Sequence, residues 1–417
     1  MDALAGELRD GFDLAGEGER ADLVVVNTCA ITADAESAAR QAIRRVAREH
    51  PGARIVAAGC CAAVRPETLA GLPGVAAVVG PRAQAGVARV VSELCGARPA
   101  ASAPGGAPGW SDGAARPARH TRPFLKVQDG CDHGCAFCVV PLARGPSRSL
   151  PPEDALRRLA ALGARHAEVV LTGVHLGGYG RDLAPRASLE GLVREAARRG
   201  LVGRLRLSSV EPGELPLALL RDPEARRLLC EHFHLPVQSG SARVLCAMGR
   251  PGGDRALRRA VEEVWAHAPG ACLGTDLVAG FPGETEADHR ETVALVESLP
   301  LAYLHVFPFS ARPGTAAARM AGAVPAAAVK ARVRELRAVS ERRWRAYLAA
   351  QIGRDLDVVA ERVAGGFARG TAGRYVGVRW PSSGETRGQL VRVRIVAVEG
   401  EECLGVRARV FASRLPP

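Results

Sequence analysis

Apolar segments of strand length alternate with helical segments along this chain, and this pattern restricts its fold more than any other feature. The expected strands are residues 124–128, 168–174, 204–210, 232–237, 272–281 and 303–310, with helices such as 153–162, 254–268 and 285–299 between them. Repeated strand–helix units build parallel sheets. We therefore expect residues 121–350 to form a (β/α)6 partial TIM barrel, closed by a long helix near residues 325–350.

The segment before this domain has a simpler pattern. Residues 1–95 contain two apolar runs, 23–27 and 54–59, on either side of a helical segment at 33–49. A strand–helix–strand unit of this kind predicts a parallel α/β domain. Residues 96–120 are rich in Ala, Pro and Gly without periodicity, which is typical of a linker.

The pattern changes again after Gly353. Short alternating runs are separated by glycine-rich turns, which predicts a small antiparallel β-barrel over residues 351–417. Arginines are interleaved with aromatic residues there, as in surfaces that neutralise phosphates and stack on bases. The residues concerned are Arg362, Phe367, Arg369, Arg374, Tyr375, Arg379, Trp380, Arg387, Arg392 and Arg394.

Composition narrows the class of protein. No apolar run reaches the roughly 18 residues that cross a bilayer, and the opening MDALAGELRD is not a signal peptide. We therefore expect a cytoplasmic protein with no membrane partner. The net charge of +12 favours an anionic partner, with nucleic acid first. Eleven cysteines in such a chain indicate metal or redox chemistry rather than disulfides.

The cysteines of CDHGCAFC are the strongest chemical signal. Cys131, Cys135 and Cys138 follow an expected strand directly, at the end of the barrel where active sites lie. Three thiolates on a four-iron cluster leave one iron open to a substrate such as S-adenosylmethionine (SAM). The alternative is a structural zinc with His133 as fourth ligand, although no second C-x2-C pair is present.

The motifs around these cysteines resemble the radical SAM methylthiotransferases. The resemblance runs through FLKVQDG, CDHGCAFC, VVPLARGPSRS, LTGVHLGGYG, RLSSVEP, HLPVQSGS, GTDLVAGFPGET and HVFPFSARPGTAAA, and it covers most of the chain from Asp22 onward. Within the family, ARGPSRS, LTGVHLGGYG and HVFPFSARPGT are most similar to the enzymes that act on N6-threonylcarbamoyladenosine at position 37 of tRNA. Their layout is similar too, and implies that the C-terminal barrel is an RNA-binding domain of the TRAM type.

The resemblance implies a second [4Fe-4S] cluster. Two of its three cysteines match here, Cys29 in VVVNTCA and Cys60 in AAGCC. The third is expected before a helix that this sequence enters at its first residues, so that cysteine is absent. We expect either a start codon assigned too late or a copy defective at this cluster, with Cys61 as a candidate substitute ligand.

The resemblance also implies residues around SAM. Thr172 and Gly173 lie where backbone groups meet the SAM amino group, and Ser209 and Glu211 lie near its other polar groups. Further expected contacts are Gln238 to the ribose, Gly280 beside the adenine, and Arg144 to the SAM carboxylate or an RNA phosphate. Tight turns between strands and helices would explain the glycines equally well.

The implied reaction adds a methylthio group to C2 of the modified adenine. One SAM supplies the methyl group, and a second SAM is cleaved reductively to a 5′-deoxyadenosyl radical, with electrons from a protein such as flavodoxin or ferredoxin. The sequence shows no His–carboxylate constellation, and C–H activation does not require one. Isopentenyl-adenosine in tRNA and an aspartate of a ribosomal protein are alternative substrates. A non-catalytic RNA-binding zinc protein is the alternative outside the family.

Overall fold

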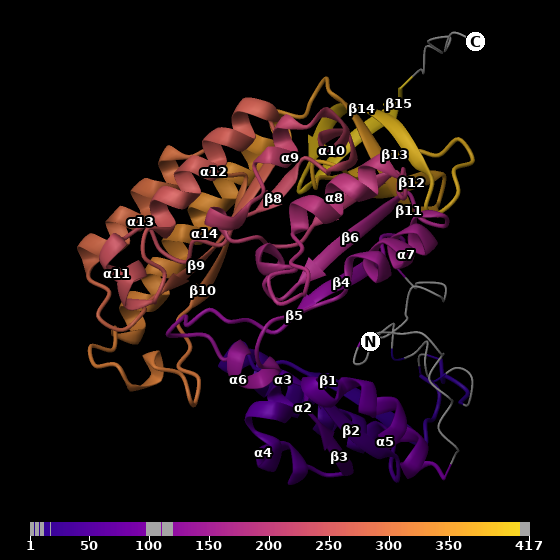
Figure 1. Ribbon diagram of the computed structural model, residues 1–417, viewed down its shortest axis with the longest axis vertical. Coiled ribbons are helices and arrows are strands. Elements are labelled where there is room, and N and C mark those ends of the chain that lie inside the picture. Colours follow the sequence, from indigo (N-terminus) through magenta and orange to yellow (C-terminus); the bar gives the residue numbers. More distant parts are fainter. Residues whose placement is uncertain are drawn as a thin grey trace.

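The computed structural model describes Leu4, Leu8, residues 12–16, residues 18–96, Trp110 and residues 120–408. Most of the linker expected at residues 96–120, and the chain after residue 408, lie outside these residues. Figure 1 shows three regions, with a partial barrel between an N-terminal sheet and a small C-terminal barrel.

The N-terminal region is a three-stranded parallel sheet in the order β1-β2-β3, flanked by helices. Its elements are β1 (Leu23–Thr28), α2 (Ala33–Glu49), β2 (Arg54–Gly59), α3 (Cys60–Val64), α4 (Pro66–Ala70), β3 (Val75–Val79), η1 (Pro81–Gly86) and α5 (Val87–Leu94). Helix α2 covers the range expected from the sequence, and it begins where the Thr32 side chain accepts a hydrogen bond from the Ala35 amide. Strand β3 was not expected.

The central region contains six parallel strands, β4, β6, β7, β8, β9 and β10, as the sequence predicted. They form two sheets, β5-β4-β6-β7 and β10-β9-β8, which adjoin at the pair Leu205/Leu229. The first half comprises β4 (Phe124–Asp129), α6 (Val140–Arg144), β5 (Arg148–Ser149), α7 (Pro152–Gly163), β6 (Glu168–Gly173), η3 (Leu176–Gly178), α8 (Leu189–Arg198), β7 (Arg204–Leu207) and η4 (Pro212–Glu214). The second half comprises α9 (Ala218–Arg221), α10 (Pro223–Leu228), β8 (His232–His234), α11 (Ala242–Ala247), α12 (Gly253–His267), β9 (Cys272–Ala279), α13 (Glu286–Ser298), β10 (Tyr303–Pro308), η5 (Ala317–Arg319) and α14 (Ala326–Ala349).

Alternation along the barrel strands separates two faces. Leu304 and Val306 of β10 belong to the main hydrophobic core, together with Val333 and Leu336 of α14. Between them on the strand, His305 is exposed. The same alternation holds along the other strands, so the helices cover one face of the sheets and the opposite, concave face carries polar residues.

The C-terminal region is a closed barrel in the order β11-β12-β13-β15-β14. Its strands are β11 (Asp355–Ala364), β12 (Phe367–Ala372), β13 (Gly377–Pro381), β14 (Leu390–Glu399) and β15 (Glu402–Arg407). The small barrel is confirmed, but one of its pairings, β13 with β15, is parallel rather than antiparallel. Closure leaves this sheet without a free edge.

Buried arginines join the C-terminal barrel to the start of the central strands. Arg204 and Arg206 of β7 donate to the backbone carbonyls of Asp357 and Ala372 at 2.7 and 3.0 Å. The fully buried Glu168 at the start of β6 pairs with both guanidinium groups. The small barrel therefore lies at the N-terminal ends of the parallel strands, opposite the end that carries the sequence motifs.

Within the part of the chain that the structure describes, no helix has both the length and the apolar character that a bilayer crossing requires.

Candidate active site

The cysteine loop leaves the C-terminal end of β4, where the sequence placed it. Its three thiols, Cys131, Cys135 and Cys138, are free and partly exposed. The loop is fixed at both ends, because the Cys131 amide donates to the Gly145 carbonyl at 3.1 Å and the Cys138 amide donates to the Cys135 carbonyl at 3.0 Å. A loop of this kind presents sulfur atoms without enclosing them.

The spacing of the three sulfurs suits a cluster better than a single zinc ion. Zinc–sulfur bonds of about 2.3 Å would hold the sulfurs about 4 Å apart. Among the described residues, the sets whose ligand atoms all lie within 4.8 Å of one another do not include these cysteines. In a four-iron cluster each thiolate binds a different iron, so wider spacing is expected. The donor set therefore fits a [4Fe-4S] cluster.

Neighbouring cations distinguish Cys135 from the other two thiols. Burial raises the pKa of Cys138 to about 11 and also raises the pKa of Cys131. Burial alone would raise the pKa of Cys135 as well, but a hydrogen bond from His133 and the charge of Arg250 lower it overall. Cys135 is thus the cysteine of this loop most readily present as a thiolate.

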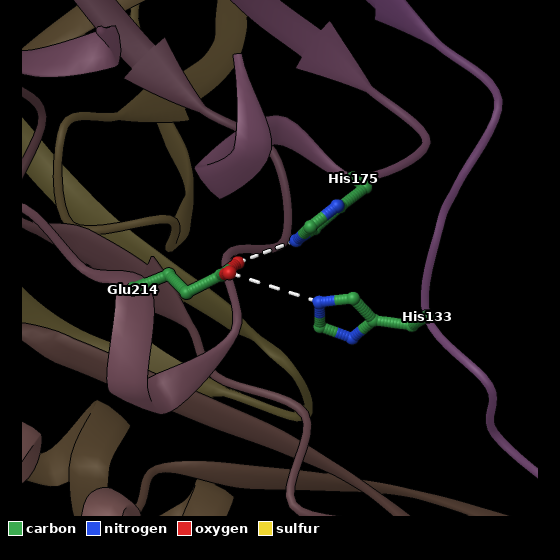
Figure 2. Close-up of side chains that lie close together, drawn as sticks. All are labelled: His133, His175 and Glu214. Carbon is green, nitrogen blue, oxygen red and sulfur yellow. Dashed lines mark hydrogen bonds and ion pairs between the residues drawn. The ribbon is translucent and has the colours of Figure 1, made fainter. Parts of the chain in front are cut away.

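A His–carboxylate cluster lies beside the loop, contrary to the expectation from the sequence. Figure 2 shows His133 of the loop and His175, which follows β6, both directed at Glu214 of η4. The Glu214 oxygens lie 2.5 Å from His175 Nε2 and 3.7 Å from His133 Nε2. Hydrogen bonds to Cys135 and Glu214 raise the pKa of His133 to about 10. His133 therefore connects the cysteine loop to two strand ends.

Arg250 makes a second connection to the loop. Its guanidinium lies 3.7 Å from Cys135 Sγ and holds both carboxylate oxygens of Glu211, the residue expected near the polar groups of SAM. It also donates to the Pro236 carbonyl at 2.8 Å. Arg250 thereby ties the ends of β7 and β8 to the cysteine loop. Sequence patterns do not indicate this role, because Cys135 and Glu211 lie 115 and 39 residues from Arg250 along the chain.

The other residues expected around SAM lie at strand ends. Thr172 and Gly173 end β6, and Ser209 is exposed just after β7. Gln238 has a left-handed backbone with φ of 77°, held by hydrogen bonds to both sides of Leu277 in β9. A side chain at Gly280 would collide with Val329 of α14, so helix packing already explains that glycine. Their contacts with SAM stay predictions.

Cys29 and Cys60 lie side by side at the end of the N-terminal sheet. The last pair of the β1–β2 register is Thr28 with Gly59, and each cysteine follows directly. Both are partly exposed. Cys61 is fully buried in the core of this region. Parallel strand ends therefore present Cys29 and Cys60 to the same side, whereas Cys61 packs inward.

The two cysteine sites are neighbours in space. Val139 directly follows Cys138, yet it packs in the N-terminal core with Ala30, which follows Cys29, and with Cys61. Helix α3, which begins at Cys60, packs against α6, which begins two residues after Cys138. Figure 1 shows these helices meeting where the two regions touch. Both loops thus open toward one interface.

Arg144 lies at this interface rather than among the residues around Cys135. It donates to Asp129 Oδ1 at 2.9 Å at the end of β4. Burial would lower its pKa, but Cys60 and Asp129 raise it overall. A second link is the buried pair of Arg312, after β10, with Glu36 of α2. These contacts hold the N-terminal sheet against the barrel.

Replacing Gly59 by alanine should disturb the Cys29/Cys60 pair. Gly59 has φ of 118°, and a Cβ atom there would collide with the Thr28 carbonyl and lie 2.8 Å from Asn27 Oδ1. We expect a loss of roughly 1–3 kcal/mol in unfolding free energy and less iron bound after reconstitution. Gly86→Ala is the control, because nothing lies within 4 Å of its added Cβ. Equal melting temperatures and iron contents for the two variants would contradict the expectation.

Comparisons with known proteins agree with this architecture. Residues 1–80 match a family described as uncharacterized protein family UPF0004, and residues 125–296 match the Radical SAM superfamily. The chain is 33% identical over 356 residues to threonylcarbamoyladenosine tRNA methylthiotransferase MtaB of Aquifex aeolicus, covering 84% of this chain and 86% of that protein. The chain belongs to the radical SAM methylthiotransferases.

Two other matches show how far this assignment extends. The tRNA-2-methylthio-N(6)-dimethylallyladenosine synthase of Novosphingobium aromaticivorans is 35% identical, covering 84% of this chain and 81% of that protein. Among solved structures, the radical SAM methyltransferase TsrM of Kitasatospora setae has a TM-score of 0.55 at 16% identity, covering 76% of this chain and 73% of that one, which shows the fold alone. This methylthiotransferase is therefore an enzyme that uses a [4Fe-4S] cluster with SAM, in a family with a second cluster.

Proposed function

We propose that this methylthiotransferase modifies tRNA, adding a methylthio group to C2 of N6-threonylcarbamoyladenosine at position 37. The observation that carries the transfer reaction is the closeness of the two cysteine sites, through Val139 next to Cys138 and Ala30 next to Cys29. Sulfur transfer needs a site that activates the substrate carbon and a neighbouring site that holds the sulfur. The two loops that open toward one interface supply that arrangement.

Each part of the chain has a task in this proposal. Cys131, Cys135 and Cys138 would hold the cluster, which together with SAM would supply radical chemistry for activation of the C2–H bond. Arg250 keeps Glu211 beside Cys135 and so fixes one wall of the SAM site. The remaining strand-end residues, Thr172, Gly173, Ser209, Gln238 and Gly280, complete that wall.

Cys29 and Cys60 are proposed as ligands of the second cluster. Arg144 lies between Cys60 and Asp129, so its charge compensates thiolate charge at this site rather than the SAM carboxylate. We further propose that a flavodoxin- or ferredoxin-type protein delivers the electrons, and that the enzyme acts in the cytoplasm, where tRNA is modified.

The C-terminal barrel offers a smaller RNA surface than the sequence suggested. Trp380 is fully buried and cannot bind a base, whereas Tyr375 is 39% exposed but already stacks on His232 of the central region. Phe367 is 45% exposed beside a cavity of 180 Å³, and its ring lies 5.6 Å from the Arg379 guanidinium. Arg362 and Arg369 also line this cavity. An aromatic ring among arginines suits base stacking next to phosphate contacts.

Replacing Phe367 by alanine should weaken tRNA binding by about 5- to 150-fold, because stacking of one base contributes about 1–3 kcal/mol. Filter binding or fluorescence anisotropy with tRNA would measure the change. The control is Trp265→Ala, which removes a ring of similar exposure, 40%, from α12. If both variants bind tRNA as tightly as the unaltered protein, this surface does not bind RNA.

Nucleoside mass spectrometry of tRNA tests the proposed substrate. The gene is introduced into a strain that lacks its own tRNA and ribosomal-protein methylthiotransferases, and the modified adenosines and the mass of the ribosomal protein are then measured. Conversion of N6-threonylcarbamoyladenosine to its 2-methylthio derivative supports the proposal. Conversion of isopentenyl-adenosine alone, or methylthiolation of a ribosomal-protein aspartate with tRNA unchanged, would replace it with one of the alternative substrates.

A further inference from the structure

The concave face of the partial barrel has a closed end. Tyr375, in the turn between β12 and β13, stacks on His232 at 4.1 Å between ring centroids and lies 5.9 Å from the Tyr303 ring. Arg206 lies over the same tyrosine ring at 5.5 Å. The C-terminal barrel therefore closes the concave face at the N-terminal ends of the strands. The face opens toward the cysteine loop at the other end.

A polar cluster lies on the concave face next to this closed end. His234 of β8, Asp276 of β9 and His305 of β10 come from three adjacent strands and point to the concave side. Asp276 Oδ1 lies 2.8 Å from His234 Nε2 and 3.2 Å from His305 Nδ1. Burial would raise the pKa of Asp276, but hydrogen bonds with the two histidines lower it to about 2. Asp276 is thus a charged group that orients both rings.

The two histidines differ in whether one ring nitrogen remains available to hydrogen-bond a ligand. His234 is buried, and its second nitrogen, Nδ1, is 3.0 Å from the Tyr303 hydroxyl, so both of its nitrogens are engaged. The side chain of His305 is 52% exposed. Its Nδ1 faces Asp276, while Nε2 has no hydrogen-bond partner among the described residues. The cluster therefore presents one free, oriented hydrogen-bonding atom to the concave space.

A metal ion is a less suitable occupant of this cluster. The three ligand atoms do lie within 4.8 Å of one another, as a metal site requires. A metal would, however, have to displace the hydrogen bond that already joins His234 Nε2 to Asp276. The arrangement instead resembles a histidine held by a carboxylate so that its other nitrogen faces a ligand.

The position of His305 fits the depth of a nucleoside. It lies three residues before Pro308, the end of β10, which corresponds to about 10 Å along the strand. An adenine whose C2 lies near the cluster at the strand ends would extend its N6 substituent down the concave face by a distance of this order. Phe307, two residues closer to the opening, is 41% exposed and can contact the base.

We propose that His305, oriented by Asp276, is the specificity-determining residue that binds the polar N6 substituent of the adenine. This inference rests on the proposed function and adds the basis of its selectivity. With Nδ1–H donated to Asp276, His305 Nε2 is an acceptor. The hydroxyl and the ureido N–H of a threonylcarbamoyl group can donate to it. An isopentenyl group offers no such donor and would leave the imidazole desolvated and unpaired, which a binding site penalises strongly.

The test compares anticodon stem–loop RNAs that carry threonylcarbamoyl-adenosine or isopentenyl-adenosine at position 37. Dissociation constants for the anaerobically reconstituted enzyme are measured by fluorescence anisotropy. We expect His305→Leu to weaken binding of the threonylcarbamoyl RNA by about tenfold, because the substituent loses its hydrogen bond to Nε2 and a polar group is left unpaired. Binding of the isopentenyl RNA should not weaken, so the ratio of the two constants changes.

Three further variants make the test specific. His305→Ala should reduce the discrimination as leucine does, without adding an apolar side chain, and it replaces the leucine variant if that one does not fold. His305→Gln retains a hydrogen-bonding group and should keep more of the discrimination. The matched control, His267→Leu, alters a histidine near the end of α12 and should leave the ratio unchanged.

Failure of this inference can be told apart from failure of the proposed function. If the unaltered enzyme methylthiolates the threonylcarbamoyl RNA, while His305→Leu and His305→Ala discriminate as well as it does, the role of His305 is refuted and the proposed function stands. Equal weakening of both RNAs would also refute it. If the unaltered enzyme methylthiolates only the isopentenyl RNA, the proposed function fails, whatever the variants do.

Discussion

Replacing Cys138 by alanine is expected to abolish methylthiolation and to remove about four irons per chain, the content of one [4Fe-4S] cluster. Cys138 supplies one of only three thiolates in its loop, so the cluster has no spare protein ligand there. Even replacing a residue that merely orients a metal ligand typically costs about 10- to 100-fold in activity or affinity. Loss of a ligand should exceed that range, and 5′-deoxyadenosine formation should fall to the level without protein.

The matched control for this experiment is Cys246→Ala. Cys246 is an exposed cysteine of α11 that lies outside both cysteine sites, so its loss should change neither iron content nor turnover. Iron and sulfide are measured after anaerobic reconstitution, and 5′-deoxyadenosine is measured by chromatography. A Cys138→Ala protein that keeps its full iron content and cleaves SAM normally would refute the assignment of this loop as the cluster site.

The same measurement separates the two cysteine sites. If Cys29 and Cys60 hold a second cluster, Cys138→Ala should keep about four irons, whereas a variant that also lacks Cys29 and Cys60 should keep almost none. The adjacency of the sites through Val139 leads to a second expectation. Because Val139 packs in the N-terminal core with Cys61, which lies two residues after Gly59, a backbone shift at Gly59 should reach the Cys138 loop. The Gly59→Ala variant should reveal this coupling as iron lost from both sites.

The fold was largely predictable because it depends on local patterns. The strands of the central region begin at the residues where the apolar runs begin, for example at Phe124 and Glu168. Five of the six ends were predicted too late, whereas β4 extends one residue beyond its predicted end. Strand β8 stops at His234, two residues before Pro236, whose ring nitrogen cannot donate to a neighbouring strand. Strand β3 was missed, because its small apolar residues, VAAVV, give a weak signal between two turns.

The side-chain clusters were not predictable, because they depend on register between distant strands. Nothing in the spacing of His234, Asp276 and His305 shows that β8, β9 and β10 are adjacent and place them together. His133 and Glu214 meet in the same way, although they are far apart in sequence. The cysteine loop was predictable because its three proposed ligands lie in one short sequence motif. Local motifs thus indicated the chemistry, whereas the residues proposed for selectivity could be identified only from the structure.

Replacing Glu168 by glutamine is expected to destabilise the contact between the central region and the C-terminal barrel. Glu168 is fully buried at the start of β6, and its oxygens lie 2.7 Å from Arg204 Nε and 2.8 Å from Arg206 Nε. Arg122 lies 3.6 Å away. Without the carboxylate, the two buried arginines lose their counter-ion. Breaking such a pair from one side typically costs about 3–5 kcal/mol, so the melting temperature should fall by several degrees.

The stability of the protein at acid pH should also depend on the ionised Glu168 side chain. Burial would raise the pKa of Glu168, but the neighbouring arginines lower it below its ordinary value of 4.5. A carboxyl group with a lowered pKa stabilises the folded state above its ordinary value, and that contribution is lost as the pH falls through the folded-state pKa. The unaltered protein should therefore lose stability below pH 4.5 more steeply than the Glu168→Gln variant, whose side chain does not titrate.

Two comparisons decide whether the buried network causes the effect. Glu195→Gln removes a carboxylate that pairs with Arg198 and Arg199 on the exposed face of α8, and it should leave the melting temperature unchanged. Combining Glu168→Gln with Arg206→Met should cost less than the sum of the single changes, because the second change removes a charge that the first left unpaired. Strictly additive losses would mean that the two residues act independently.

Arg206 also lies over the Tyr375 ring, which closes the concave face near His305. Replacing Glu168 or Arg206 should therefore displace Tyr375 and reduce the discrimination between the two RNAs.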